Sequence, residues 1–175
     1  MTSQNLKTKI IQHSQKRQLI HLMANLSEDV VRISGMEPLY FPESCIFITD
    51  VLEISKKISE KRHFATKEQA CKQMEILLSY LSDESALLCS FPNFSIFDNM
   101  PVSNLPVLKV NGQCVRLIFN EVLNLNDIIH VFICATHDLK KGIFFDVCAG
   151  DPEITGSDAP IYDIHLWGFN NGPNN

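Results

Sequence analysis

The sequence lacks the short motifs that mark common catalytic and nucleotide-binding sites. A glycine-rich phosphate loop, a G-x-S-x-G nucleophile turn and an H-E-x-x-H zinc helix are all absent. No run of about 18 apolar residues occurs, so no segment is expected to span a membrane. These absences exclude the enzyme and membrane-protein classes that such motifs identify. What is left is a protein whose function depends on shape and charge, or on residues far apart in the sequence.

A recognisable export signal is also missing. Lys7, Lys9, Lys16 and Arg17 interrupt every apolar stretch near the start, where a secretory signal would need one. Disulfide frameworks belong to exported chains, and no cysteine stands in a C-x-x-C pair. We therefore predict a cytoplasmic protein whose cysteines are reduced and pack as small apolar side chains. The cysteines are Cys45, Cys71, Cys89, Cys114, Cys134 and Cys148.

The chain has 175 residues, of which 45% are hydrophobic and 20% charged. Such a composition is typical of a folded globular protein, and the length fits one domain. We predict a single α+β domain over residues 1–175, with a helical part over about 1–85 and a β part over about 105–170.

Four helices are expected in the first half. Residues 4–26 place apolar side chains at three- and four-residue steps, which predicts one buried face. Ser27 caps a short helix that ends at Gly35, and a third helix covers residues 50–61, with an alternative start near Glu43. Thr66 caps a fourth, with Gln69 three residues later. The residues expected near that face are Leu6, Ile10, Leu19, Leu22, Met23 and Leu26.

Strands are expected in the second half, after a proline-rich connection over residues 92–106. The pair Asn111-Gly112 stands between two apolar runs, 107–110 and 114–119, which predicts a hairpin with a type I′ turn. Further strands are expected over 128–135, 143–148 and 161–167. These strands form an antiparallel meander of about five, and the helices are expected to cover one of its faces.

Candidate metal sites are weak. Cys134 and His137 have the spacing of zinc ligands, but only Cys148 and His165 of the later strands offer a second pair. Residues 151–156 resemble the start of a calcium-binding EF-hand loop, yet Tyr162 stands where the bidentate glutamate belongs. We interpret these residues as a core thiol, an exposed histidine and an acidic turn, with a different kind of calcium site left open. No metal and no cofactor are predicted.

Charge is distributed unevenly. Residues 1–72 hold 11 basic and 8 acidic residues, whereas residues 73–175 hold 4 basic and 12 acidic ones. Between Asp146 and Asp163 there are five acids and no base. Acidic groups steer a basic partner and aromatic side chains anchor it, which predicts a partner-binding surface in this segment. Its residues are Asp146, Asp151, Glu153, Asp158, Tyr162, Asp163 and Trp167.

The first helix has the opposite charge, since no acid precedes Glu28. A basic helix can contact nucleic acid or an anionic surface. The aromatic residues that stack on single-stranded bases are missing from it, so we expect a solvated face and no binding of nucleic acid.

The leading hypothesis is an acidic inhibitor of the immunity-protein kind, which neutralises a basic partner such as a toxin nuclease. One alternative is a secretion-type chaperone or adaptor with an exposed apolar groove. A second alternative is a small enzyme with a site assembled from distant residues. The candidates for that site are His130, Cys134, His137, Asp138 and His165.

Overall fold

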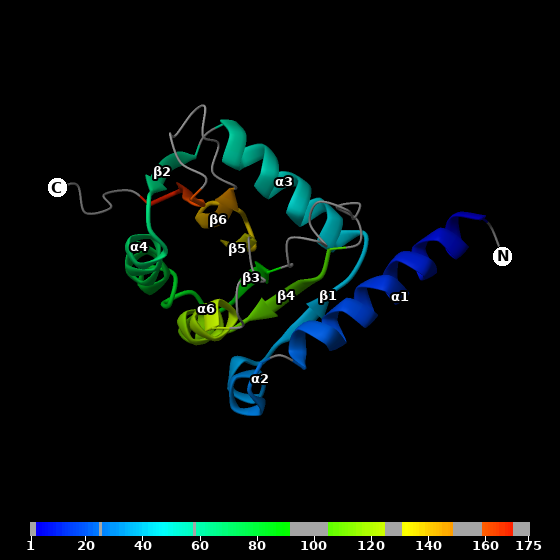
Figure 1. The fold of residues 1–175 in the computed structure, drawn as a ribbon. Helices are drawn as coiled ribbons and strands as arrows, with labels where there is room; N and C mark the ends of the chain where they lie inside the picture. Colours follow the sequence, from blue (N-terminus) through cyan, green and yellow to red (C-terminus); the bar gives the residue numbers. More distant parts are fainter. Residues whose placement is uncertain are drawn as a thin grey trace.

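The computed structural model describes residues 3–24, 26–57, 59–91, 105–124, 131–148 and 159–169 (Figure 1). The described helices are α1 (Ser3–Met23), α2 (Glu28–Ser34), α3 (Glu43–Lys57), α4 (Lys67–Ser79) and α6 (Val115–Asn124), with a short 3-10 turn, η2 (Gly112–Cys114), before α6. The described strands are β1 (Glu37–Leu39), β2 (Glu60–Phe64), β3 (Leu87–Ser90), β4 (Val107–Val110), β5 (Val131–Thr136), β6 (Gly142–Cys148) and β7 (Ile161–Trp167).

These strands form one seven-stranded sheet in the order β1-β4-β3-β5-β6-β7-β2. Every pair of neighbours is antiparallel. The α+β class is confirmed, with five strands in the second half of the chain and two edge strands from the first half.

The central strands are apolar on both sides, so both faces of the sheet must be covered. On one face, α2, α4 and α6 pack over side chains such as Phe132 and Phe145. On the other face, α3 packs over Ile133 and Phe144. The expectation that helices cover one face was wrong, because Phe47, Ile48 and Val51 place α3 opposite the other helices (Figure 1).

Two helix starts follow the expected capping chemistry. The Ser27 side chain accepts a hydrogen bond from the Val30 amide, and Gly35 ends α2 with a φ of 56°. The Thr66 hydroxyl accepts a hydrogen bond from the Gln69 amide at 3.3 Å. The third helix begins at Glu43, the alternative start, and ends at Lys57, so that Lys61 lies in β2.

The hairpin predicted at Asn111-Gly112 was wrong. The Asn111 side chain accepts a hydrogen bond from the Gln113 amide at 3.0 Å and so caps η2, which leads into α6. Gly112 serves a close approach instead of a turn, because a Cβ there would lie 2.2 Å from the Glu84 carbonyl oxygen. Residues 114–119 are therefore mostly helical, and the buried side chains of α6 follow a three- and four-residue spacing. They are Val115, Ile118, Phe119 and Val122.

Candidate functional site

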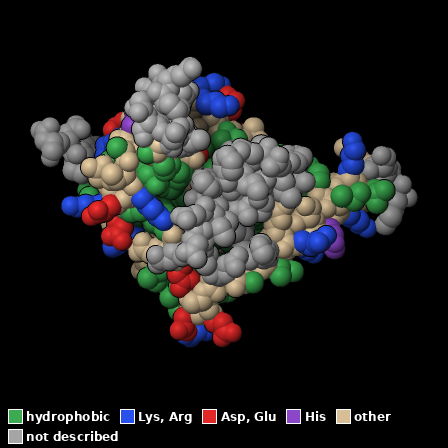
Figure 2. All heavy atoms as spheres, in the orientation of Figure 1, with side chains coloured by type: hydrophobic (Ala, Val, Ile, Leu, Met, Phe, Trp, Pro, Cys, Tyr) green, Lys and Arg blue, Asp and Glu red, His purple; other side chains and the backbone are tan. Residues whose placement is uncertain are grey.

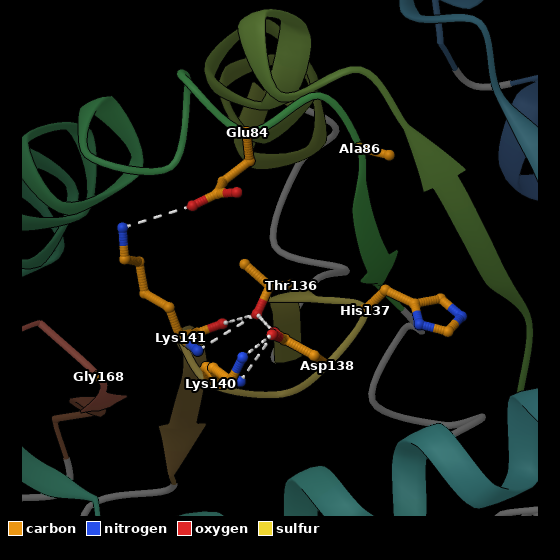
Figure 3. Close-up of a pocket in the computed structure, with 8 residues that line it drawn as sticks. All are labelled: Glu84, Ala86, Thr136, His137, Asp138, Lys140, Lys141 and Gly168. Carbon is orange, nitrogen blue, oxygen red and sulfur yellow. Dashed lines mark hydrogen bonds and ion pairs between the residues drawn. The ribbon is translucent and has the colours of Figure 1, made fainter.

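The turn that joins β5 to β6 borders an open pocket of about 760 Å³ (Figure 3). The turn is tightly hydrogen-bonded: Thr136 Oγ1 donates to Asp138 Oδ1 at 2.8 Å, and the Lys140 amide donates to the same oxygen at 3.2 Å. The Lys140 side chain bonds to Asp138, and with Thr136 and the Lys140 amide it lowers the pKa of that carboxyl to about 2. The pocket is lined by Glu84, Ala86, Thr136, His137, Asp138, Lys140, Lys141 and Gly168.

The end of β7 fixes this turn in place. The Trp167 indole N–H donates to the Leu139 carbonyl at 2.9 Å. Gly168, with a φ of 75°, lies so close that a Cβ would stand 1.8 Å from the Lys140 carbonyl oxygen. Leu139 itself has a φ of 56°, a left-handed conformation that is rare for leucine. The pocket therefore has a rigid wall.

The charged side chains of the pocket form ion pairs with one another. Lys140 pairs with Asp138, and Lys141 Nζ lies 3.5 Å from Glu84 Oε1. Figure 3 shows Lys141 directed toward Glu84 and the His137 ring turned to the opposite side. The Thr136 hydroxyl is engaged within the turn. Among these described lining residues, no hydroxyl or thiol contacts a histidine.

A second polar site lies where β2 pairs with β7. Asp163 is only 4% exposed, and its carboxylate binds His63 Nδ1 at 2.6 Å and Lys61 Nζ at 2.9 Å. His63 stands directly opposite Asp163 in the sheet. Asp163 therefore bonds to two side chains of β2 and holds β2 at the edge of the sheet.

His165 links β7 to the end of α3. Its Nδ1 lies 3.3 Å from the Ser55 carbonyl and 3.3 Å from Ser59 Oγ, and its ring meets Phe144 edge to face. Burial lowers the pKa of His165, and the nearby Lys61 adds to that effect. The neutral ring is therefore favoured, with Nδ1–H donating to the Ser55 carbonyl.

The described candidates for an assembled active site are dispersed. Cys134 is completely buried beside Cys89, with 3.3 Å between the two sulfur atoms, and burial raises the pKa of its thiol well above the usual range. His137 lies at the exposed turn, His165 lies on the other face of the sheet from Cys134, and His130 falls outside the described residues. No group of three His, Cys, Asp or Glu side chains in the described part of the chain could hold a metal ion.

The predicted acidic surface is only partly described. Asp151, Glu153 and Asp158 lie outside the described residues. Asp146 is half-buried and faces Asp163 across β6 and β7. Partner binding by this segment stays a prediction.

Of the two aromatic residues expected as anchors, Trp167 is buried and Tyr162 is half-buried. Tyr162 stacks on Phe145 with ring centroids 6.4 Å apart and packs against the core on one face of the sheet. Trp167 is 5% exposed and belongs to the core on the other face. Their rings therefore pack on opposite sides of the sheet and do not form one surface together.

The two most exposed large apolar side chains of the described residues, Ile20 and Ile10, belong to α1, which projects from the body (Figure 1). Polar contacts attach its inner face. Gln15 Nε2 donates to Ser44 Oγ at 2.7 Å, and Gln15 Oε1 accepts from the Phe41 amide at 2.9 Å. Gln12 Nε2 donates to the Phe41 carbonyl at 3.0 Å. Farther along the helix, Leu19 enters the core.

The outward face of α1 is apolar and basic. Leu6 is 55%, Ile10 60% and Ile20 69% exposed, and His13 and Arg17 continue the same line in steps of three and four. The helix carries Lys7, Lys9, Lys16 and Arg17 and no acid. None of these four bases forms an ion pair with another described residue, although Lys16 lies 5.5 Å from the centre of the Tyr40 ring. In Figure 2 the projecting arm shows hydrophobic, basic and histidine side chains and no acidic ones.

Sequence reasoning placed Leu6 and Ile10 in the core, and that expectation was wrong. The available signal was the row of glutamines at positions 12, 15 and 18, which lies on the same side as Leu19 and marks a polar inner face.

Comparisons with family models, with curated proteins and with solved structures found no significant match. No helix in the described ranges has the length and apolar content needed to cross a bilayer.

Proposed function

We propose that this chain is a protein-binding module that recognises its partner through the outward face of α1. The observation that supports this proposal is the exposed line of Leu6, Ile10 and Ile20 on a helix whose four bases have no acidic partner among the described residues. Three aliphatic side chains in one line are costly to leave in water, since burying each would contribute about 1.5–3 kcal/mol. The binding surface is therefore a helix face and needs no catalytic group.

The chemistry of this face defines the partner. A helix docks into an apolar groove through residues at three- and four-residue steps on one side. Leu6 and Ile10 have that spacing, and Ile20 follows on the same side after His13 and Arg17. Lys9, Lys16 and Arg17 flank or interrupt that line and attract a rim of acidic residues. The partner is a protein with an apolar groove bordered by carboxylates.

The proposal is tested by an Ile10→Glu/Ile20→Glu variant in pull-down and cross-linking experiments. We expect loss of the bound protein, because a carboxylate would then face the acidic groove. Ile76→Glu is the matched control, since Ile76 is an exposed isoleucine on α4. Unchanged capture by the α1 variant, or equal loss in both variants, would contradict the proposal.

A second candidate is the immunity-type inhibitor, which Asp151, Glu153 and Asp158 favour, three acids in a segment of the sequence without a base. In this role the acidic segment covers the basic cleft of a toxin nuclease or similar partner. Neutralising Asp151, Glu153 and Asp158 together is expected to slow association and to flatten its dependence on salt. Association rates that do not change would rule out this surface.

A further inference from the structure

One side of α3 has a surface complementary to α1. Glu43, Ile46, Asp50 and Glu53 follow one another in steps of three and four, so they share one side of the helix. All four are exposed, and Ile46 is 57% exposed. Lys57 continues this side of the helix and pairs with Glu53, and the nearby Lys56 also helps to lower the pKa of the Glu53 carboxyl. We call these four residues the acidic stripe.

The stripe leads into a hollow of about 400 Å³ between α3 and the turn after β5. Ile54 and Leu139 form its apolar wall, and Asp50, Glu53 and Lys57 surround it. An aliphatic side chain fits such a hollow, and carboxylates at its border suit the bases of a helix that carries that side chain.

The two surfaces match in charge and in length. α1 has four bases and no acid, whereas the whole chain has a net charge of −5, so the remainder is strongly acidic. Ile10 and Ile20 are separated by about 15 Å along α1 at 1.5 Å per residue. Ile46 and Ile54 are separated by about 12 Å along α3 at the same rise. Lys16 and Arg17 lie between the two isoleucines on α1, and Asp50 and Glu53 lie between those on α3.

Within one chain the two surfaces do not meet. α1 contacts the start of α3 through Gln15 and Ser44, and from there the N-terminal half of α1 extends away from α3 (Figure 1). We propose that the partner of the α1 face is a second copy of this chain. This inference rests on the proposed function of that face. Each α1 lies along the acidic stripe of the other copy, so that the same contact forms twice in a two-fold dimer.

The test is a charge exchange between the two surfaces of the full chain. One variant carries Lys9→Glu/Arg17→Glu and the other carries Asp50→Lys/Glu53→Lys. Like charges then meet in each homodimer, and we expect the dissociation constant to rise at least about tenfold. When the two variants are mixed in equal amounts, a heterodimer has one native contact, between the unchanged α1 and the unchanged acidic stripe. In its other contact both surfaces have reversed charge and still attract, so a one-to-one heterodimer is expected. Native mass spectrometry and sedimentation velocity distinguish these species.

Circular dichroism of each variant checks that it is folded. A wild-type chain that stays monomeric, a dimer that persists in both variants, or a mixture that stays monomeric would each overturn the inference.

The proposed function can be tested separately from this inference. If the wild type is monomeric but Ile10→Glu/Ile20→Glu releases a different protein, the role of α1 stands and the second copy is excluded. If neither self-association nor any capture depends on α1, both proposals fail.

Discussion

Leu139 occupies a backbone conformation that a glycine would adopt without strain. Its φ of 56° crowds the Cβ against its own backbone, at a cost of roughly 1–2 kcal/mol. The side chain offsets this cost by packing on the core beneath α3 and by lining the hollow there. The leucine is therefore retained for its side chain, and its backbone conformation is held by the surrounding turn.

Two substitutions separate these contributions. Leu139→Ala loses the packing and keeps the strain, whereas Leu139→Gly loses the packing and relieves the strain. We expect the glycine variant to be the more stable of the two by about 1 kcal/mol, although both are less stable than wild type. Urea unfolding measures the difference, and an alanine variant at least as stable as the glycine variant would show that Leu139 is not strained.

His165 makes the attachment of α3 to β7 sensitive to acid. Its pKa is lowered in the folded state from an ordinary value of 6.5, mainly by burial, so the unfolded chain binds the proton more readily. Stability from this group is complete above pH 6.5 and is lost as the pH falls from there toward the lowered pKa of the folded state. His165→Gln is expected to reduce the loss of unfolding free energy between about pH 7 and about pH 5. Equal losses in variant and wild type would contradict this assignment.

At the scale of elements, one buried amide is among the contacts that attach α1 to the body. Gln15 is completely buried and bonds to Ser44 Oγ and the Phe41 amide, and its Nε2 lies 3.3 Å from the Leu105 carbonyl. Removing such a group leaves buried partners unsatisfied, which costs about 1–3 kcal/mol.

Gln15→Ala is therefore expected to release α1 locally and to speed hydrogen exchange over residues 3–23. Gln4→Ala, at an exposed position of the same helix, serves as the control. Equal exchange rates in the two variants would show that apolar contacts such as those of Leu19 are what hold α1.

Local sequence signals predicted correctly those helices and strands whose structure does not depend on contacts with distant residues. The caps at Ser27 and Thr66 and the strands near residues 143–148 and 161–167 followed from such signals and are confirmed. The Asn111-Gly112 pair misled, because Gly112 is required by the backbone of Glu84, a contact between residues far apart in the sequence. The edge strands β1 and β2 were missed for the same reason, since such short segments become strands only when a partner is present. The buried strand β3 was missed as well.

The sequence predicted a charged binding surface, but it could not predict which side chains are exposed or what they contact. Asp163 was identified from its charge, but its pairing with Lys61 and His63 depends on the register of β2, which no local pattern sets. The exposure of Leu6 and Ile10 likewise depends on how α1 leaves the body.

At the scale of the whole molecule, one sheet joins two apolar cores. Ile143 is buried in the core beneath α4 and α6, and Ile133 in the core beneath α3. If the sheet couples these cores, the chain unfolds as a single domain.

A matched pair of substitutions tests this coupling. Ile143→Val and Ile133→Val are each expected to lower the unfolding free energy by about 0.5–1.5 kcal/mol. The fluorescence of Trp167, the sole tryptophan, and the far-ultraviolet circular dichroism should shift together in both variants. A fluorescence shift in Ile133→Val without a matching change in circular dichroism would indicate two separately unfolding units.

The pairing of β2 with β7 has a consequence for synthesis on the ribosome. Residues 60–64 pair with residues 162–166, so β2 emerges about a hundred residues before its partner exists. At about 5–20 residues per second, that delay lasts roughly 5–20 seconds. During this time β2 presents Glu60, Lys61, Arg62 and His63, and charged side chains on an unpaired strand oppose association with neighbouring nascent chains. The polar side chains that bind β2 to β7 in the folded sheet therefore also oppose association of β2 with other chains before β7 is synthesised.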